Sequence, residues 1–172
     1  MSFILVKDEP DQHLYRHDSF LLNIHWDELR LQHLISIANV CDQIIKDHGS
    51  LTSLILLRGA VNVDLSNETR KASAALTAKC NPYNTGQAVV VEANGFMASL
   101  ARSVITGINL LARAKTSQRV FQDTREATAW LVSLPAQPAG VRDELDTLWP
   151  QIEKIMQQRS RSSTGQARIA TS

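Results

Sequence analysis

The 172-residue sequence has few cysteines, almost no net charge and no long hydrophobic run, and each shortage excludes a class of protein. Cys41 and Cys80 are the only cysteines, too few for a disulfide framework. The formal net charge of +1 gives no general attraction to nucleic acid or to an anionic membrane. We therefore expect a protein of a reducing, cytoplasmic setting that has no nucleic-acid partner.

No uninterrupted apolar run reaches the roughly 18 to 20 residues that cross a bilayer. The long apolar segment 96–114 is interrupted by polar residues, among them Arg102 and Asn109. The N-terminus turns acidic at Asp8 and Glu9 after a short apolar stretch, without the basic region and cleavage site of a secretion signal. The sequence predicts neither a membrane span nor export.

The second half of the chain alternates strand patterns with helix patterns. The valine-rich run Gln87–Glu92 leads to a long apolar helix, Phe96–Ala114, and Arg119–Gln122 leads into a helix at Thr124–Leu131. Strands that are continuous in valine are typical of parallel sheets whose two faces are covered by crossover helices. This pattern predicts an α/β fold in which Val89–Val91 lies inside the sheet.

The first half shows the same alternation. Its strand candidates are residues 3–6, 13–16, Phe20–Trp26 and Leu51–Leu57. After the third of these, Asp27 is a suitable helix cap, and apolar residues then recur at spacings of three and four as far as Gly49, a left-handed helix stop. A second helix is expected at Asn67–Cys80, because Ser66 precedes it and Asn81-Pro82 ends it.

The C-terminal part differs from the rest in pattern and composition. We expect an α/β domain at 1–134 and a helical extension at 135–158, in which Pro150 divides two short helical pieces. Residues 159–172 are rich in Ser, Arg, Thr and Gln, and we expect a disordered tail there.

This order of elements resembles the STAS domain, the fold of anti-sigma-factor antagonists and of the cytoplasmic tails of sulfate transporters. The resemblance spans about Phe20 to Leu131 and is carried by the segments Gln87–Leu111 and Arg119–Leu131. The likeness is greatest to uncharacterised bacterial STAS-like proteins. It implies a mixed or parallel sheet with crossover helices, followed here by a C-terminal helical appendage.

The resemblance also implies a role for one serine. In antagonist-type STAS domains, a partner kinase phosphorylates a serine at the start of the second helix, within an Asp-Ser-Ser-Gly-like stretch. The matching segment is Asp64–Glu68, which holds Ser66 but lacks the Ser-Gly pair. Ser66 is therefore a candidate phospho-switch by resemblance, whereas its chemistry alone predicts a helix N-cap. Asp64 and Glu68 would repel a phosphate at this place.

Five residues are candidates for an anion-binding site: Arg58, Arg70, Lys71, Asn94 and Gly95. The first three would supply positive charge near the second helix, and the last two would let backbone amides approach an anion. The alternative for the basic residues is an ordinary solvated surface, and for Asn94-Gly95 a simple tight turn.

No group of residues has the spacing of a metal, cofactor or catalytic site. His13 and His17 are four residues apart, but no Glu or Cys completes a ligand set nearby. Cys41 and Cys80 fall at helix positions that suit small core-facing side chains. We expect no cofactor and no metal; whether the protein is an enzyme stays open, and catalysis is disfavoured.

The long helix at 96–114 has more apolar surface than one sheet face needs. Phe96, Ile105 and Leu110 lie off its main apolar stripe and are candidates for an interface. Either a partner, including a second copy of the chain, or the C-terminal helical segment would cover them.

From these observations we predict a non-catalytic protein-interaction or regulatory module that forms a homodimer or binds another protein. The alternative is a carrier or enzyme that binds a small anionic or lipid-like ligand at the carboxyl ends of the strands. No apolar cavity can be distinguished from an ordinary core in the sequence.

Overall fold

The computed structural model describes residues 2–26, 28–58, 62–63, 66–92, 103, 107 and 118–169. Six strands form its main sheet in the order β1-β2-β3-β5-β7-β8, and β4 pairs with β6 in a second small sheet. The main strands are β1 (Ile4–Asp8), β2 (Gln12–His17), β3 (Phe20–His25), β5 (Leu51–Leu57), β7 (Asn84–Val91) and β8 (Gln118–Phe121). The small strands are β4 (Glu28–Leu29) and β6 (Asn62–Val63).

The main sheet is mixed, as the resemblance implied. β1, β2 and β3 form an antiparallel meander, whereas β3, β5, β7 and β8 run parallel to one another. In the parallel part, Asn23 is paired with Ile55, and Ile55 with Val89. The Val89–Val91 segment thus lies between two neighbouring strands and is almost fully buried, which confirms the prediction for this strand.

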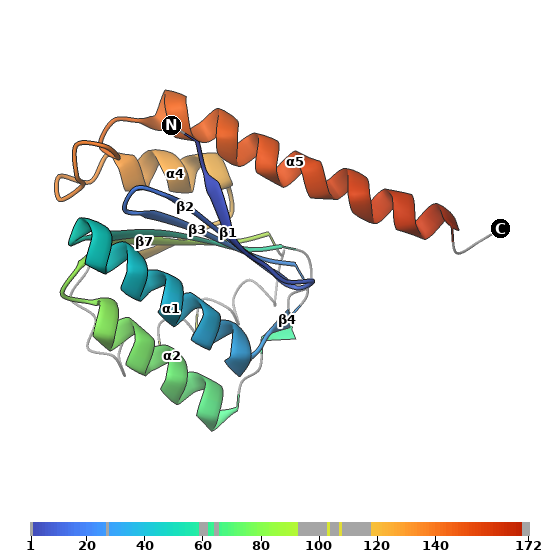
Figure 1. The fold of residues 1–172 in the computed structure, drawn as a ribbon, viewed down its shortest axis with the longest axis horizontal. Helices are drawn as coiled ribbons and strands as arrows, with labels where there is room; N and C mark the ends of the chain where they lie inside the picture. The colour runs from blue at the N-terminus through green and yellow to red at the C-terminus, as the bar shows by residue number, and fades with distance from the viewer. Residues whose placement is uncertain are drawn as a thin grey trace.

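Helices cover both faces of the sheet (Figure 1). α1 (Leu31–His48) and α2 (Asn67–Cys80) lie side by side on one face, and α4 (Thr124–Val132) and α5 (Leu145–Ile169) lie on the other. Glycine ends α1 as expected, because Gly49 has a φ of 69° and its N–H bonds the carbonyl of Ile45 at 2.8 Å. The predicted bounds of the helix Asn67–Cys80 are confirmed.

Alternate residues of the central strands belong to two separate interiors. In β3, the side chains of Phe20, Leu22 and Ile24 pack in the core beneath α4 and α5. Leu21 packs beneath α1 and α2, and the next residues on that face are Asn23 and His25. A strand buried on both faces has no solvent-facing side, so its residues must suit two different environments.

The C-terminal segment belongs to the core under α4 and α5. Val141, Leu148 and Ile152 are fully buried against residues of the sheet and of α4. A polar link adds to this packing: the side-chain carbonyl of Gln137 accepts hydrogen bonds from the hydroxyls of Thr52 at 2.6 Å and Thr85 at 3.1 Å.

The expected division of the C-terminal helix at Pro150 was wrong. α5 is a single helix from Leu145 to Ile169 with Pro150 inside it. Proline removes one N–H, the donor that would bond the carbonyl of Asp146, and this lies close to the start of the helix. Burial of Leu148 and Ile152 on either side of the proline holds the helix in one piece.

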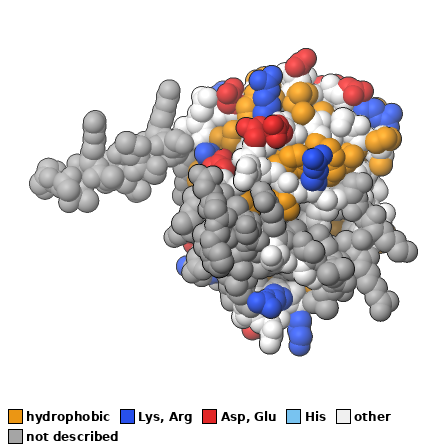
Figure 2. Space-filling view, turned by 180° about the vertical axis from the view of Figure 1, so that it is seen from behind, with side chains coloured by type: hydrophobic (Ala, Val, Ile, Leu, Met, Phe, Trp, Pro, Cys, Tyr) orange, Lys and Arg blue, Asp and Glu red, His pale blue; other side chains and the backbone are white. Residues whose placement is uncertain are grey.

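The described surface carries charges of both signs. Seen from behind, Lys and Arg side chains alternate with Asp and Glu among hydrophobic ones (Figure 2). Among the described residues, no helix has both the length and the apolar content that crossing a membrane requires.

The buried position of α5 generates a prediction about stability. Replacing Leu148 with Ala should lower the free energy of unfolding by about 2 to 5 kcal/mol, because a fully buried leucine leaves a cavity when it is truncated. Ile35 on α1 is 59% exposed and is the matched control, since Ile35→Ala should change stability by less than about 1 kcal/mol. Urea unfolding measures the free energy of unfolding of both variants. A loss for Leu148→Ala as small as that for Ile35→Ala would show that α5 is not part of the core.

Candidate functional site

Ser66 caps α2. Its hydroxyl oxygen accepts a hydrogen bond from the backbone N–H of Thr69 at 3.2 Å, and the side chain is exposed at the surface. This is the geometry expected of a serine N-cap, which satisfies one of the free N–H groups at a helix start. The phospho-switch at Ser66 stays a prediction.

The predicted anion site divides between described and undescribed residues. Arg58 binds the carboxylate of Glu92 at 2.8 Å and lies over the ring of Trp26, so its charge is already paired. Arg70 and Lys71 are exposed on α2. The remaining candidates for the anion site and for the interface, Asn94, Gly95, Phe96, Ile105 and Leu110, lie outside the described residues.

The structure brings other residues together around a cavity of about 140 Å³ between the sheet and the helices α1 and α2. Its apolar wall comes from both layers: Leu34, Ile37, Leu76, Ile55, Leu57 and Val89. Polar side chains, among them Asn23, Ser53 and Gln87, line it from the strands. Arg58, Arg70 and Lys71 are not among the described lining residues.

A buried hydrogen-bond network borders this cavity at the end of β3. The side-chain nitrogen of Gln12 donates to the side-chain oxygen Oδ1 of Asn23 at 3.2 Å and lies 3.5 Å from Nε2 of His25. Gln12 and His25 are directly paired across the β2–β3 ladder, which places both on the same face of the sheet. Nδ1 of His25 and Oε1 of Gln12 have no hydrogen-bond partner among the described residues.

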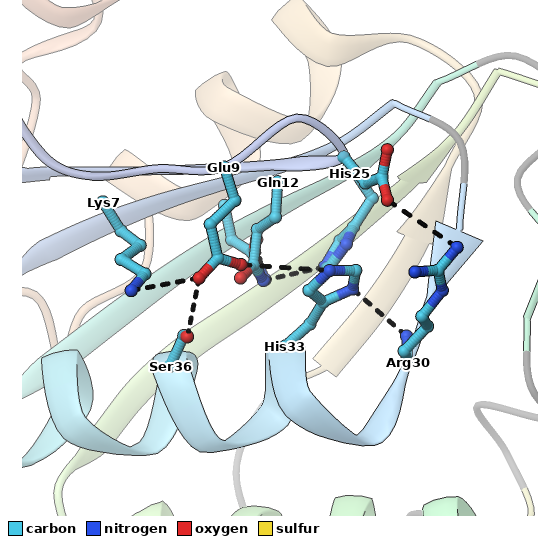
Figure 3. Close-up of polar contacts among 9 residues, drawn as sticks. Lys7, Glu9, Gln12, His25, Arg30, His33 and Ser36 are labelled. Carbon is cyan, nitrogen blue, oxygen red and sulfur yellow. Dashed lines mark hydrogen bonds and ion pairs between the residues drawn. The ribbon is translucent and has the colours of Figure 1, made fainter.

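A second histidine connects this region to the turn after β1 (Figure 3). His33 on α1 accepts a hydrogen bond from the backbone N–H of Arg30 at 3.1 Å, and its ring lies 5.8 Å from that of His25. Glu9 lies 3.9 Å from Nε2 of His33 and also contacts Ser36. The β1–β2 turn is therefore joined to α1 by side chains rather than by backbone pairing alone.

The electrostatics of the cavity are governed by burial. Desolvation, together with a smaller effect of the neighbouring His33, lowers the pKa of His25 to about 3. His25 is thus a neutral imidazole at physiological pH. None of the described lining residues is Asp, Glu, Lys or Arg.

Cys41 on α1 and Cys80 on α2 are hydrogen-bonded to each other, and both line the cavity. Both are buried free thiols, as the sequence predicted for small core-facing residues. A hydrogen bond with Cys80, together with burial, raises the pKa of Cys41 well above its ordinary value. Cys41 therefore stays a thiol, whereas the same hydrogen bond lowers the pKa of Cys80. The described residues contain no group of three or more His, Cys, Asp or Glu side chains arranged to hold a metal ion.

The arrangement of the strands and helices defines a STAS-like fold, also called SpoIIAA-like. A solved structure with this fold is that of an uncharacterised protein of the DUF3478 family from Shewanella loihica PV-4. The two chains are 17% identical, with a TM-score of 0.50, and the match covers 70% of this chain and 91% of the other. At this identity the likeness shows the fold alone. No family profile and no curated protein matches the chain.

Sequence reasoning did not find the cavity or its polar border. A signal was present: Asn23 and His25 occupy alternate positions in the otherwise apolar strand Phe20–His25. Two polar side chains on one face of a buried strand need partners or a ligand, because an unpaired buried polar group is costly. Ser53 on β5 and Gln87 on β7 are paired in register. They are likewise polar residues inside largely apolar strands, so they give the same indication of a polar site.

The Ser66 cap generates a stability prediction. Ser66→Ala should lower the free energy of unfolding by about 1 kcal/mol, whereas Ser66→Asp should stay within a few tenths of the wild type, because Asp also accepts the Thr69 N–H. Urea unfolding of the three proteins measures this. Losses of the same size in both variants would contradict the capping role.

The burial of His25 generates a pH prediction. A lowered folded-state pKa means that the unfolded chain binds the proton more readily, so the contribution to stability is present above pH 6.5 and is lost as pH falls toward 3. Between pH 6.5 and 4.5, wild type should lose about 2 kcal/mol more than His25→Gln. Urea unfolding at a series of pH values measures the difference, and parallel curves for the two proteins would refute it.

Proposed function

We propose that the protein is a non-catalytic interaction module that forms a homodimer through the edge strand β1. β1 pairs with β2 on one side only, so its other edge is unpaired among the described strands. Its three apolar residues are exposed to an unusual degree: Ile4 60%, Leu5 44% and Val6 38%. An exposed, apolar strand edge is a template for pairing with another chain.

The composition of β1 favours a second copy of this chain as the partner. The strand is apolar at Ile4–Val6 and charged at Lys7 and Asp8. An antiparallel pair about a two-fold axis through Leu5 places Ile4 of each copy opposite Val6 of the other. This register joins the apolar parts and keeps the charged residues at the two ends of the interface, which suits a self-complementary contact.

A regulatory role is supported by the fold in a general way. A SpoIIAA-like fold is consistent with a regulatory module that acts by binding. Burial makes His25 a weak base, and the hydrogen bond with Cys80 together with burial makes the Cys41 thiol a poor nucleophile, so neither of these two residues is activated for attack on a substrate. The exposed edge of β1 is the observation that carries the proposal, since it offers a contact surface that the described residues of the monomer do not pair with.

Leu5 tests this interface. In the proposed register Leu5 of one copy meets Leu5 of the other, so Leu5→Lys should raise the dimer dissociation constant at least tenfold by placing two ammonium groups together. Leu5→Asp should do the same, and an equal mixture of the two variants should restore association as a heterodimer. Sedimentation velocity over a wide concentration range measures each case.

Ile35→Lys is the matched control, because Ile35 is also an exposed apolar residue but lies on α1. This variant should dimerise like the wild type. A wild-type protein that stays monomeric up to about 100 μM, in the range of weak complexes, would refute the homodimer. A mixture that fails to associate would refute the register.

A second candidate function, a small-molecule carrier, has support of its own. The cavity under α1 and α2 has a mostly apolar wall and a polar border, the usual composition of a ligand site. It lies against the face of the sheet, whereas the sequence placed the ligand at the carboxyl ends of the strands.

A further inference from the structure

The cavity under α1 and α2 has the size of a small organic molecule. At about 140 Å³ it is comparable to apolar protein cavities that stay free of water and bind molecules of the size of benzene. Leu34 and Ile37 line it from α1, and Ile55 and Val89 line it from the sheet. An apolar ligand would therefore gain contacts with both walls.

His25 supplies an unused polar atom at the border of the cavity. The residue is 1% exposed, and its Nδ1 has no hydrogen-bond partner among the described residues. One hydrogen of the Gln12 amide bonds Asn23, and the other lies toward Nε2 of His25, which then acts as the acceptor. In this arrangement the ring proton is on Nδ1, a buried atom that has no acceptor among the described residues.

The charge of the ligand follows from the lining. With His25 neutral and no Asp, Glu, Lys or Arg among the described lining residues, an ionised group would enter without a counter-charge. Burying an uncompensated charge is far more costly than burying a carbonyl that accepts one hydrogen bond. The site thus disfavours carboxylates, phosphates and ammonium groups.

We infer that the cavity binds a small, uncharged, mainly apolar molecule whose carbonyl or similar acceptor oxygen is bound by Nδ1–H of His25. This inference rests on the carrier function proposed for the cavity and adds the chemistry of its ligand. It is independent of the β1 interface, which lies at the edge of the sheet.

Two probes that share one carbon skeleton test the inference: acetophenone, which has an acceptor oxygen, and ethylbenzene, which has none. Affinities of both for the full chain are measured by NMR titration. His25→Phe keeps an aromatic ring of similar size but cannot donate, so the affinity ratio of acetophenone to ethylbenzene should fall about fivefold to tenfold relative to wild type.

His17→Phe is the control. His17 is also a buried histidine with an unpartnered Nδ1 among the described residues, but it lies on the opposite face of the sheet, against Phe3. Its replacement should leave the affinity ratio unchanged. In the wild type, acetophenone and not ethylbenzene should also shift the ring-nitrogen resonances of His25, a readout that does not depend on how well the variant folds.

The outcomes separate the two levels of the inference. If the wild type binds neither probe, the carrier function fails. If it binds both, but the His25→Phe ratio equals that of wild type or the His25 resonances do not move, the carrier function stands and the role of His25 is refuted.

Discussion

Burial of the central strands on both faces is the constraint from which the rest of the structure follows. β3, β5 and β7 have no solvent-facing side, so each needs helices above and below it. This requirement explains why α5 is an integral layer: without Leu148 and Ile152, α4 alone would cover the face that holds Phe20 and Ile24 only in part. The two faces are not equivalent, since one is mainly apolar with a buried Gln137–Thr52–Thr85 link and the other contains a cavity bordered by polar side chains.

Much of the fold could be predicted because its determinants are local. The valine run at Val89–Val91 has no polar face, and only a strand inside a covered sheet accommodates it. Ser66 and Gly49 mark helix ends through hydrogen bonds with backbone groups a few residues away. Asp123 does the same for α4, because its side chain accepts a hydrogen bond from the N–H of Glu126 at 2.7 Å. Such signals do not depend on distant parts of the chain.

The candidate site could not be predicted because it depends on distant residues. Whether Asn23 and His25 are satisfied is decided by Gln12 on β2 and by the helix packed above, and neither can be read from the strand alone. The prediction that Pro150 divides the helix was wrong for a similar reason. The free-energy cost of proline in a helix is outweighed by burial of neighbouring residues against the sheet. β4 and β6 are only two residues each, too short to carry a periodic signal.

The pairing of β1 with β2 contains an irregularity: the register shifts between Leu5 and Lys7, which leaves Val6 as an extra residue. A bulge of this kind increases local twist and shortens the straight part of an edge. In a dimer joined through β1, the unpaired edge of β1 would be covered in both copies. Growth of a continuous ribbon from such a pair would require the opposite margin at β8, so association along β1 would stop at two copies and would not by itself propagate into fibres.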